Sequence, residues 1–542
     1  MGKRINDLHN WLGRFLSGQK ITIVIVAACI VARVIQLVFF FNIRVDASYQ
    51  VMATMHFVNG HGLSFGEVFA NDLSVTHYET LWNWPPGYSI LLAPFYLASG
   101  QNYIIAGIAL DIVTATFLIL ISRSLLKKLE VRLYLRNIFT ILTSFFIYSF
   151  YFVASSDAIA ISFFIAAFYF YVSILKNSGS PLTRASLLAL CLIACAWIKY
   201  LFIPVVFIIP ILLFIQGRTN GNKSIKTSGI ISFLILFTGV AILLVFQKLT
   251  AGSTGYISQP ERGFFPGHLR HFYPFIPAAF LRPDTLDVFF KIKASIVHLF
   301  FQVIHLLVFV ASLLWFSHYV YKKRFQLVSP REGFLYSSVF ISLGIFLLLA
   351  LLSLRVAREE ILPGVFWTYI EETRYYGLVF VLIHLSLFIY FKWLSARLRM
   401  AFFFILLLLS TEAARGIFFT ARRVMLLGKE TYSWQRESKF QQYAGKVIQN
   451  ALTNKHVQRV VIAGSSYYMN HRVSLHCNAP ILYDQGKLNS PDLIGSRQPA
   501  LLLVMLQESE MEKFRPFLDA GGKELAGQFN GFYFYTLYVG SR

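Results

Sequence analysis

Residues 21–41 read ITIVIVAACIVARVIQLVFFF, an almost uninterrupted apolar run. About 20 apolar residues are enough for a helix to cross a bilayer core, so this run predicts a membrane-spanning helix. It is too long for the core of a signal peptide, and we interpret it as an uncleaved anchor. Further apolar runs lie at about 102–122, 137–154, 158–175, 186–199, 201–216, 228–246, 294–320, 334–354, 374–391 and 399–420. Together they predict a polytopic α-helical membrane protein with about eleven spans.

The composition supports this class. Of the 542 residues, 56% are hydrophobic and 14% are charged, and the mean hydropathy is +0.59. These values exclude a soluble globular chain and a disordered one. The net charge of +23 comes from Lys and Arg in short clusters between the apolar runs, a pattern of membrane topology and not of nucleic-acid binding. The four cysteines are too few for a disulfide framework.

The basic clusters indicate the topology. They lie in the N-terminal residues 1–20 and then in alternate connections, around 123–136, 176–184, 218–226, 322–331 and 392–399. The positive-inside tendency makes these connections cytoplasmic. It therefore predicts outer loops at 42–101, 247–293 and 355–373, and places residues 423–542 outside the membrane. We expect a multi-pass protein of the inner (plasma) membrane whose N-terminus is cytoplasmic. Tyr88 to Ser99 is interpreted as a short helix that dips into the outer leaflet.

The composition becomes more polar after Arg423, and residues 423–542 are predicted to form a small α/β domain. Strands are expected at 459–463, 500–506 and 532–539. The turn from Ala463 to Ser466 follows a strand, as phosphate-binding loops do, but the rest of a phosphate-binding fingerprint is missing. An ordinary strand-to-loop turn is the alternative. No arrangement of base, nucleophile or metal ligands is visible in this domain, and we expect it to be accessory, with a part in acceptor approach.

Six short motifs lie in a definite order along the chain. They are Val45-Asp46-Ala47-Ser48-Tyr49, Gly60-His61-Gly62-Leu63, the stretch from Trp84 to Phe95, Ser156-Asp157-Ala158, Trp197-Ile198-Lys199-Tyr200 and Thr373-Arg374-Tyr375-Tyr376-Gly377. Over roughly residues 20–400 this order resembles the GT-C glycosyltransferases, in particular the protein O-mannosyltransferase and lipid A aminoarabinose transferase branch. One departure is Ala47, because the family often has Asp-Glu at this point. A second carboxylate there has no carrier in this chain.

The resemblance implies a GT-C membrane fold and an inverting sugar transfer. The donor would be a polyprenyl phosphate sugar, and the acceptor a lipid, glycan or protein on the outer face. We expect no cofactor: the chain has neither an Asp-x-Asp motif for a metal-bound nucleotide sugar nor a Walker loop.

The residues themselves support this chemistry. Glycosyl transfer needs a base for the acceptor's hydroxyl proton and cations for the departing phosphate. Asp46 is the candidate base, and the candidate cations are Lys199, Arg355, Arg358 and Arg374. The motifs add further candidate substrate-binding residues, namely Tyr49, Tyr88, Asp157, Tyr200 and Tyr375.

Structural alternatives stay open for these residues. Asp46 can simply end the first helix, and Lys199 can extend to the lipid headgroups. Asp157 can be the N-cap of the span that it opens. Glu412 and Arg415, three residues apart, are interpreted as an ion pair on a helix surface.

Two other functions compete with the glycosyltransferase. A transporter that flips lipid-linked saccharides would share the many spans, but it should carry ionisable residues near the middle of several spans. Most spans here have none. A polymerase or ligase of lipid-linked glycans would be an enzyme of related geometry.

Overall fold

The computed structural model of the chain describes residues 16–40, 43, 45–81, 84–146, 156–177, 180–251, 263–290, 294–323, 326, 329–356, 359–362, 365–391, 396–425, 433–455, 457 and 459–540. Ten helices in this part of the chain are long and apolar enough to cross a membrane. The spans cover Gln19–Val38, Tyr103–Lys128, Ser156–Leu175, Pro181–Ile198, Tyr200–Thr219, Lys223–Thr250, Ile296–Lys322, Pro330–Arg355, Thr373–Tyr390 and Met400–Arg422. The chain is therefore a multi-pass membrane protein.

One predicted span, the apolar run at 137–154, is not among these ten. Helix α6 (Leu133–Phe145) has 13 residues and is too short to count as a span, and residues 147–155 lie outside the described part. The short helix expected at Tyr88 to Ser99 is present as α4 (Gly87–Ala98), with Pro94 inside it.

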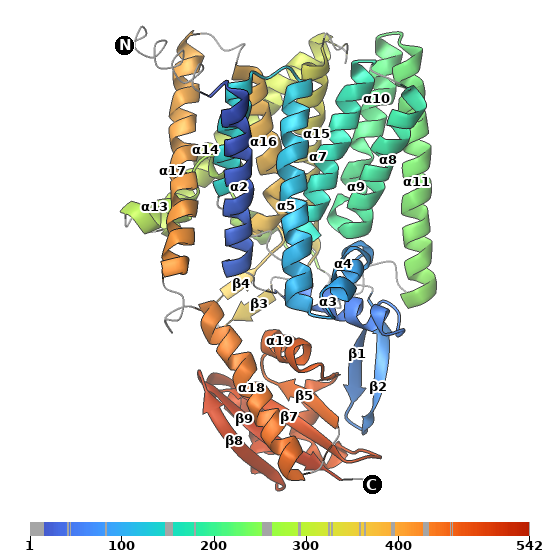
Figure 1. Cartoon of the computed structure of the whole chain (residues 1–542), viewed down its shortest axis with the longest axis vertical. Coiled ribbons are helices and arrows are strands. Elements are labelled where there is room, and N and C mark those ends of the chain that lie inside the picture. Colours follow the sequence, from blue (N-terminus) through green and yellow to red (C-terminus); the bar gives the residue numbers. More distant parts are fainter. Residues whose placement is uncertain are drawn as a thin grey trace. The chain divides into compact units, whose positions relative to one another are not determined.

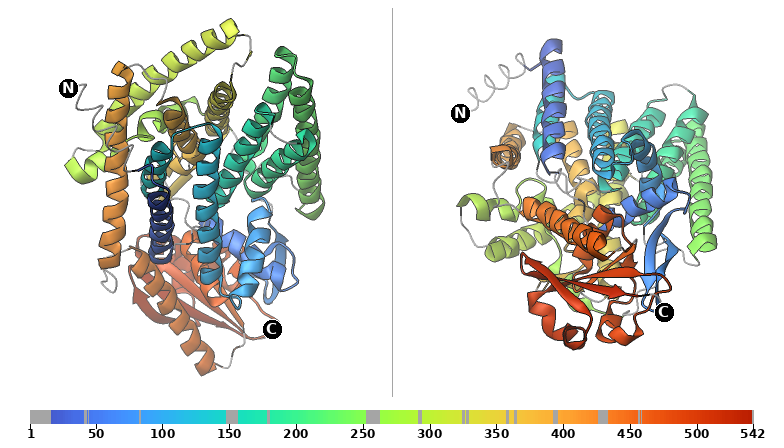
Figure 2. Two further views of the ribbon diagram at one scale, coloured as in Figure 1. Left: turned by 45° about the horizontal axis from the view of Figure 1, so that its top comes forward. Right: turned by 60° about the horizontal axis from the view of Figure 1, so that its bottom comes forward.

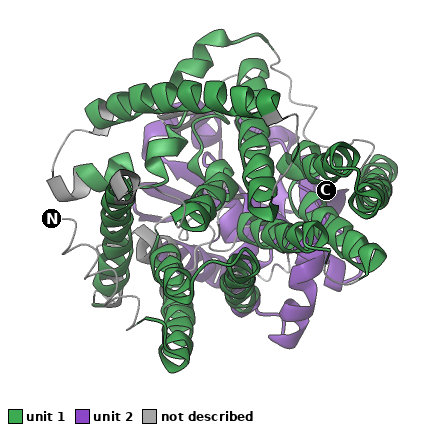
Figure 3. Ribbon diagram, turned by 90° about the horizontal axis from the view of Figure 1, so that it is seen from above, with its two compact units in different colours: residues 1–41, 108–425 green, residues 42–107, 426–542 purple. Residues whose placement is uncertain are grey.

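The chain divides into two compact units, which Figure 3 colours separately. The first comprises residues 1–41 and 108–425, and the second comprises residues 42–107 and 426–542. By this division, residues 42–107, which include the loop expected at 42–101, group with the C-terminal residues. The domain boundaries expected from the sequence kept these two segments apart.

Unit 1 is a bundle of long helices (Figure 1). Its helices are α2 (Gln19–Phe40), α5 (Tyr103–Lys128), α6, α7 (Ser156–Leu175), α8 (Pro181–Ile198), α9 (Ile203–Val206), α10 (Ile208–Thr219), α11 (Lys223–Ala251), α12 (Phe275–Ala278), α13 (Pro283–Phe290), α14 (Ala294–Lys323), α15 (Pro330–Arg355), α16 (Gly377–Tyr390) and α17 (Ala396–Met425). Short 3-10 helices η2 (Tyr200–Phe202), η4 (Pro266–His271) and η5 (Thr373–Tyr376) and a two-stranded ladder of β3 (Glu359–Leu362) and β4 (Val365–Trp367) complete it.

Helix α7 lies in the interior of this bundle. Of the ten described spans it is the most buried, and the side chains of Phe164, Phe168 and Tyr171 are inaccessible to solvent. Helix α14 is the opposite case, since Leu307 and Leu314 on its surface are exposed. Apolar side chains on the outside and an apolar interior are expected where lipid tails replace water as the solvent.

Small residues bring the helices of the α10–α11 hairpin close together. A Cβ atom on Gly217 would lie 2.2 Å from the backbone nitrogen of Lys226, and one on Gly229 would lie 2.6 Å from that of Phe214. Both distances are too short for any side chain. Glycine therefore permits a backbone approach of the kind that packs membrane helices.

Unit 2 contains a seven-stranded sheet in the order β2-β1-β6-β5-β7-β9-β8. The strands are β1 (Ser64–Phe69), β2 (Asp72–Thr80), β5 (Arg459–Gly464), β6 (Ile481–Leu482), β7 (Ala500–Gln507), β8 (Lys523–Phe529) and β9 (Phe532–Val539). The hairpin β1–β2 comes from the 42–101 segment and joins the C-terminal strands through a parallel β1–β6 pair. Helices α3 (Val45–Val58), α4, α18 (Ser433–Lys455), α19 (Tyr467–Cys477) and α20 (Arg515–Asp519), with 3-10 helices η7 (Gln485–Asn489), η8 (Pro491–Leu493) and η9 (Glu508–Phe514), complete the unit.

Strand β7 separates two hydrophobic cores. Its successive side chains point to opposite faces of the sheet. Leu502 and Val504 pack with Phe517 of α20 on one face, whereas Leu503 packs with Phe440 of α18 on the other. Helix α18 lies across that second face (Figure 2). The apolar run of β7 is thus explained by burial on both sides.

Candidate functional site

A buried ion pair lies in unit 1 where α7 begins and α8 ends. Helices α7 and α8 pack against each other, and the short connection between them brings the start of one near the end of the other. Asp157 lies in the first turn of α7, and Lys199 is the C-cap of α8. Lys199 Nζ is 2.5 Å from Asp157 Oδ1, and the two side chains are 13% and 4% exposed. The low exposure means that this pair has little screening from water.

Tyr375 joins this pair to a second cation. Lys199 Nζ lies 5.1 Å from the centre of the Tyr375 ring, and the guanidinium carbon of Arg374 lies 5.0 Å from it. Arg374 also donates a hydrogen bond to the Tyr375 hydroxyl, at 3.2 Å. The 3-10 helix η5 places these two residues side by side, directly before α16. The structure thus brings together four of the predicted residues, and we call Asp157, Lys199, Arg374 and Tyr375 the cation cluster.

A carboxylate that the sequence analysis did not single out lies next to the cation cluster. Glu372 Oε1 is 4.0 Å from Arg374 Nε. The only signal for it in the sequence was the density of acids in the 355–373 loop. With Asp157 it balances the two positive charges of Lys199 and Arg374. Each cation of the cluster thus has a carboxylate within 4.0 Å.

The remaining predicted substrate-binding residues of unit 1 are Arg355, Arg358 and Tyr200. Arg355 ends α15, and its side chain is exposed. Its backbone carbonyl accepts a hydrogen bond from the Gly263 amide. Arg358 lies outside the described residues. Tyr200 follows Lys199 directly and opens η2. Substrate contact by these three residues stays a prediction.

Asp46 lies in unit 2, in the first turn of α3, and its side chain is half-buried. Tyr49 follows one turn later and is buried. Its hydroxyl lies 2.7 Å from His471 Nε2, and its ring stacks on Trp84 at a centre-to-centre distance of 4.9 Å. Phe65 meets the same ring edge-on at 5.3 Å. An aromatic cluster therefore surrounds Tyr49, three residues after the candidate base.

Tyr88 is fully buried in α4. Two hydrogen bonds hold α4 against α3: Ser89 Oγ donates to the Gln50 carbonyl at 2.8 Å, and Thr54 Oγ1 donates to the Ser89 carbonyl at 3.2 Å. The Pro-Pro-Gly turn before α4 is thus a rigid start to a helix that supports α3. Direct substrate contact by Tyr49 and Tyr88 stays a prediction.

His471 was not predicted from the sequence, and no local pattern signals it. Burial lowers the pKa of its imidazole to about 3, so the ring is neutral at physiological pH. The hydrogen bond between Tyr49 and His471 therefore joins two neutral groups. Its strength does not change in the pH range in which most enzymes work.

A carboxyl pair lies on the β1–β2 hairpin. Burial, together with the negative charge of Glu79 and a hydrogen bond to it, raises the pKa of Glu67 to about 8. Phe65 pairs with Glu79 and Glu67 with His77, so the two carboxyl groups share one face of the hairpin. At neutral pH Glu67 can donate a proton but cannot accept one.

The expected ion pair of Glu412 and Arg415 on a helix surface is wrong. Both are buried and do not form a pair on a helix surface. Glu412 Oε1 accepts a hydrogen bond from the Arg282 amide at 2.8 Å and another from Thr285. Arg415 Nη1 donates to the Thr285 hydroxyl at 2.5 Å. These contacts attach the start of α13 to α17, and their role in the described structure is to join two helices.

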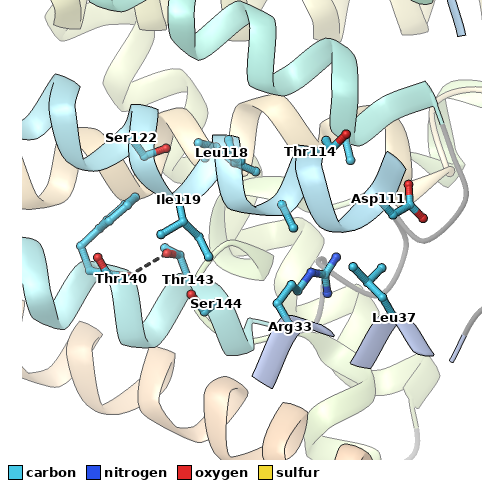
Figure 4. Close-up of a pocket in the computed structure, with 14 residues that line it drawn as sticks. Arg33, Leu37, Asp111, Thr114, Leu118, Ile119, Ser122, Thr140, Thr143 and Ser144 are labelled. Atoms are coloured by element: carbon cyan, nitrogen blue, oxygen red, sulfur yellow. Dashed lines mark hydrogen bonds between the residues drawn. The ribbon is translucent and has the colours of Figure 1, made fainter. Parts of the chain in front are cut away.

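A small pocket with a mainly apolar lining lies within unit 1 between α2, α5 and α6 (Figure 4). Arg33 extends from α2 toward α5, which carries Asp111. Arg33 also donates a hydrogen bond to Gln36 Oε1 at 2.9 Å. The cavity has a volume of about 60 Å³. Among the described residues no group of three or more His, Cys, Asp or Glu side chains could hold a metal ion.

The fold of the chain is similar to that of a solved membrane protein. The crystal structure of apo ArnT from Cupriavidus metallidurans superposes with a TM-score of 0.52 at 12% sequence identity, covering 95% of this chain and 97% of that one. ArnT is the lipid A aminoarabinose transferase, a GT-C glycosyltransferase. The chain has a GT-C-like fold.

Two further solved structures are similar to this chain with lower TM-scores. ArnT from the same organism bound to undecaprenyl phosphate has a TM-score of 0.47 at 12% identity, with the same coverage. The apo oligosaccharyltransferase of Archaeoglobus fulgidus has a TM-score of 0.47 at 10% identity, covering 92% of this chain and 71% of that one. No family model matches the chain, and no curated protein matches it in sequence. At these identities the likeness establishes the fold alone.

Proposed function

We propose that the chain is an integral membrane glycosyltransferase. It transfers a sugar from a polyprenyl phosphate donor to a lipid, glycan or protein acceptor on the outer face of the inner membrane. The observation that carries this proposal is the cation cluster, in which Lys199 and Arg374 both approach the Tyr375 ring within a largely buried site. Buried cations at the end of apolar helices suit a phosphate whose hydrocarbon tail lies in lipid.

In the proposed reaction, Asp46, Lys199 and Arg374 each have a role. Asp46 accepts the proton of the acceptor hydroxyl, and the acceptor oxygen then forms a bond to the anomeric carbon of the sugar. The bond between that carbon and the phosphate oxygen breaks, and its electron pair leaves with the polyprenyl phosphate. Lys199 and Arg374 stabilise the negative charge that the phosphate gains. A single displacement of this kind inverts the configuration at the anomeric carbon.

The proposed role of Asp157 is to position Lys199, and not to cap a helix. Its carboxylate holds Lys199 at 2.5 Å, which keeps the ammonium group in place while no donor is bound. A donor phosphate then competes with Asp157 for the same ammonium protons. Asp157 therefore sets both the position of Lys199 and the net charge of the phosphate site.

One observation bears on the rival transporter. Arg33 and Asp111 lie within spans, as a hydrated transport path would require. Their pocket, however, has a volume of about 60 Å³, and Arg33 also donates a hydrogen bond to Gln36 of its own helix. The cation cluster, which a transporter does not require, favours the enzyme.

The two functions are separated by one experiment. The purified chain is incubated in lipid vesicles with a panel of polyprenyl phosphate sugars, and the products are identified by mass spectrometry. A glycosyltransferase releases polyprenyl phosphate and transfers or hydrolyses the sugar, and an Asp46→Asn variant does so far more slowly. Movement of intact donor between the leaflets without cleavage would instead establish the transporter.

A further inference from the structure

Helix α19, near the C-terminus, contacts the helix that carries the candidate base at three points. Arg472 Nη2 donates a hydrogen bond to the Ile43 carbonyl, just before α3 begins, at 2.8 Å. The Tyr49 hydroxyl lies 2.7 Å from His471 Nε2. Further along, Ser474 Oγ lies 3.7 Å from Met52 Sδ. These contacts follow α3 from its start through its second turn.

The contacts are interior ones. His471 and Arg472 are each 2% exposed, and Tyr49 is 4% exposed. A buried arginine is unfavourable unless its protons are bound, so the bond to the Ile43 carbonyl fixes the backbone that leads into α3. Helix α19 is itself well defined, because the Ser466 side chain caps its start by accepting a hydrogen bond from the Met469 amide.

Asp46 depends on this arrangement through helix geometry. Residues three positions apart lie on the same face of a helix, so Asp46 and Tyr49 turn together. A rotation of α3 that breaks the contact between Tyr49 and His471 also turns the Asp46 carboxylate. A base must lie within hydrogen-bond reach of the proton that it accepts, and an error of about 1 Å can lower the rate about 100-fold.

A second link ties the same loop to the C-terminal strands. Glu67 and Val68 of β1 pair with Ile481 and Leu482 of β6, and the Tyr483 amide donates to the Val68 carbonyl at 2.9 Å. The hairpin and α3 are thus held by elements that lie about 400 residues further along the chain.

We propose that the C-terminal segment is part of the catalytic apparatus and that His471 and Arg472 are positioning residues which orient Asp46 through α3. This inference rests on the proposed function, in which Asp46 is the base. It replaces the accessory role expected for residues 423–542, and it assigns Tyr49 to the support of α3. Deletion of residues 430–542 then abolishes donor hydrolysis as well as transfer.

The test compares the loss of each partner with a conservative replacement. In full-length protein with a polyprenyl phosphate sugar that the wild type consumes, Tyr49→Phe and His471→Ala each lower kcat roughly 10- to 100-fold. The KM for the donor stays within about threefold, because the cation cluster is untouched. His471→Gln restores most of the rate, since its amide can replace Nε2 in the hydrogen bond. The matched control is His476→Gln, an exposed residue of the same helix, which leaves kcat unchanged.

Amide hydrogen exchange of α3 gives a readout without turnover. We expect residues 45–58 to exchange faster in Arg472→Ala and His471→Ala than in the wild type or in His476→Gln. Wild-type kcat in Tyr49→Phe and His471→Ala, with Asp46→Asn inactive, would overturn the proposal. If no donor is consumed by the wild type, the proposed function fails. Hydrogen exchange then tests by itself whether His471 and Arg472 hold α3 in place. Unchanged protection of α3 in the two variants would show that they do not.

Discussion

The pair of Lys199 and Asp157 allows stability and catalysis to be separated. Replacing Lys199 by alanine leaves the Asp157 carboxylate, which is 4% exposed, without its partner at 2.5 Å. At an effective dielectric constant of about 20, two unit charges at that distance attract by roughly 6–7 kcal/mol, and part of this offsets the removal of both groups from water. Removing one partner of such a pair costs about 3–5 kcal/mol.

The expected results follow for three variants. Lys199→Ala lowers the apparent Tm by roughly 5–10 °C and also weakens donor use. Lys199→Arg keeps the charge and restores part of both properties. The double variant Lys199→Met/Asp157→Asn removes both charges, so its Tm returns toward that of the wild type while its donor use stays impaired.

Thermal unfolding in detergent and single-turnover donor cleavage measure the two properties on the same preparations. The reasoning predicts that the double variant separates them. It is refuted if Lys199→Ala keeps wild-type Tm and wild-type donor affinity, since the ion pair would then contribute nothing and the phosphate would bind elsewhere. Arg270 in η4 would be the next candidate.

Three further outcomes are expected. Asp46→Asn should keep folding and insertion but lower transfer by about 10²–10⁴, because an amide cannot accept the acceptor's proton; near-normal turnover would remove Asp46 from the mechanism. Cysteines placed at 65–80 should react with an impermeant reagent on intact cells and those at 124–134 should not, and labelling of the latter would invert the topology. Glu67, whose folded pKa of about 8 exceeds its ordinary value, contributes stability that is fully present below about pH 4.5 and lost as the pH rises through 8. Glu67→Gln should therefore be more stable than the wild type at pH 8 by about 1–2 kcal/mol, after a discount for its partial exposure, and equally stable at about pH 4; equal melting curves at both pH values would contradict this.

The membrane class and nearly all spans were readable from the chain because they depend on local properties. Hydrophobic length decides whether a segment crosses a bilayer, and every residue that contributes to it lies in one continuous run. The short helix α4 was expected for the same reason, and the structure has it at Gly87–Ala98. Strand β7 was also predictable, since burial on both faces requires a continuous apolar run.

The cation cluster was partly predictable. Asp157, Lys199, Arg374 and Tyr375 were selected from motifs, and the structure places all four in one cluster. Their ion pair and the neighbouring Glu372 were not predicted. Which carboxylate binds which cation depends on how helix ends from distant parts of the chain meet. That information is absent from any single segment.

The environment of Asp46 was decided by the tertiary structure alone. Tyr49 and His471 are 422 residues apart in the chain, and neither carries a local pattern that indicates the other. The sequence by itself identified Asp46 as a candidate base, because a carboxylate after a membrane span is a local feature. Only the fold brings α19 against α3, because burial of the apolar faces of α3, α4 and the hairpin requires partners that residues 42–107 do not contain. A neutral, buried histidine thereby becomes the neighbour of the helix that carries the base.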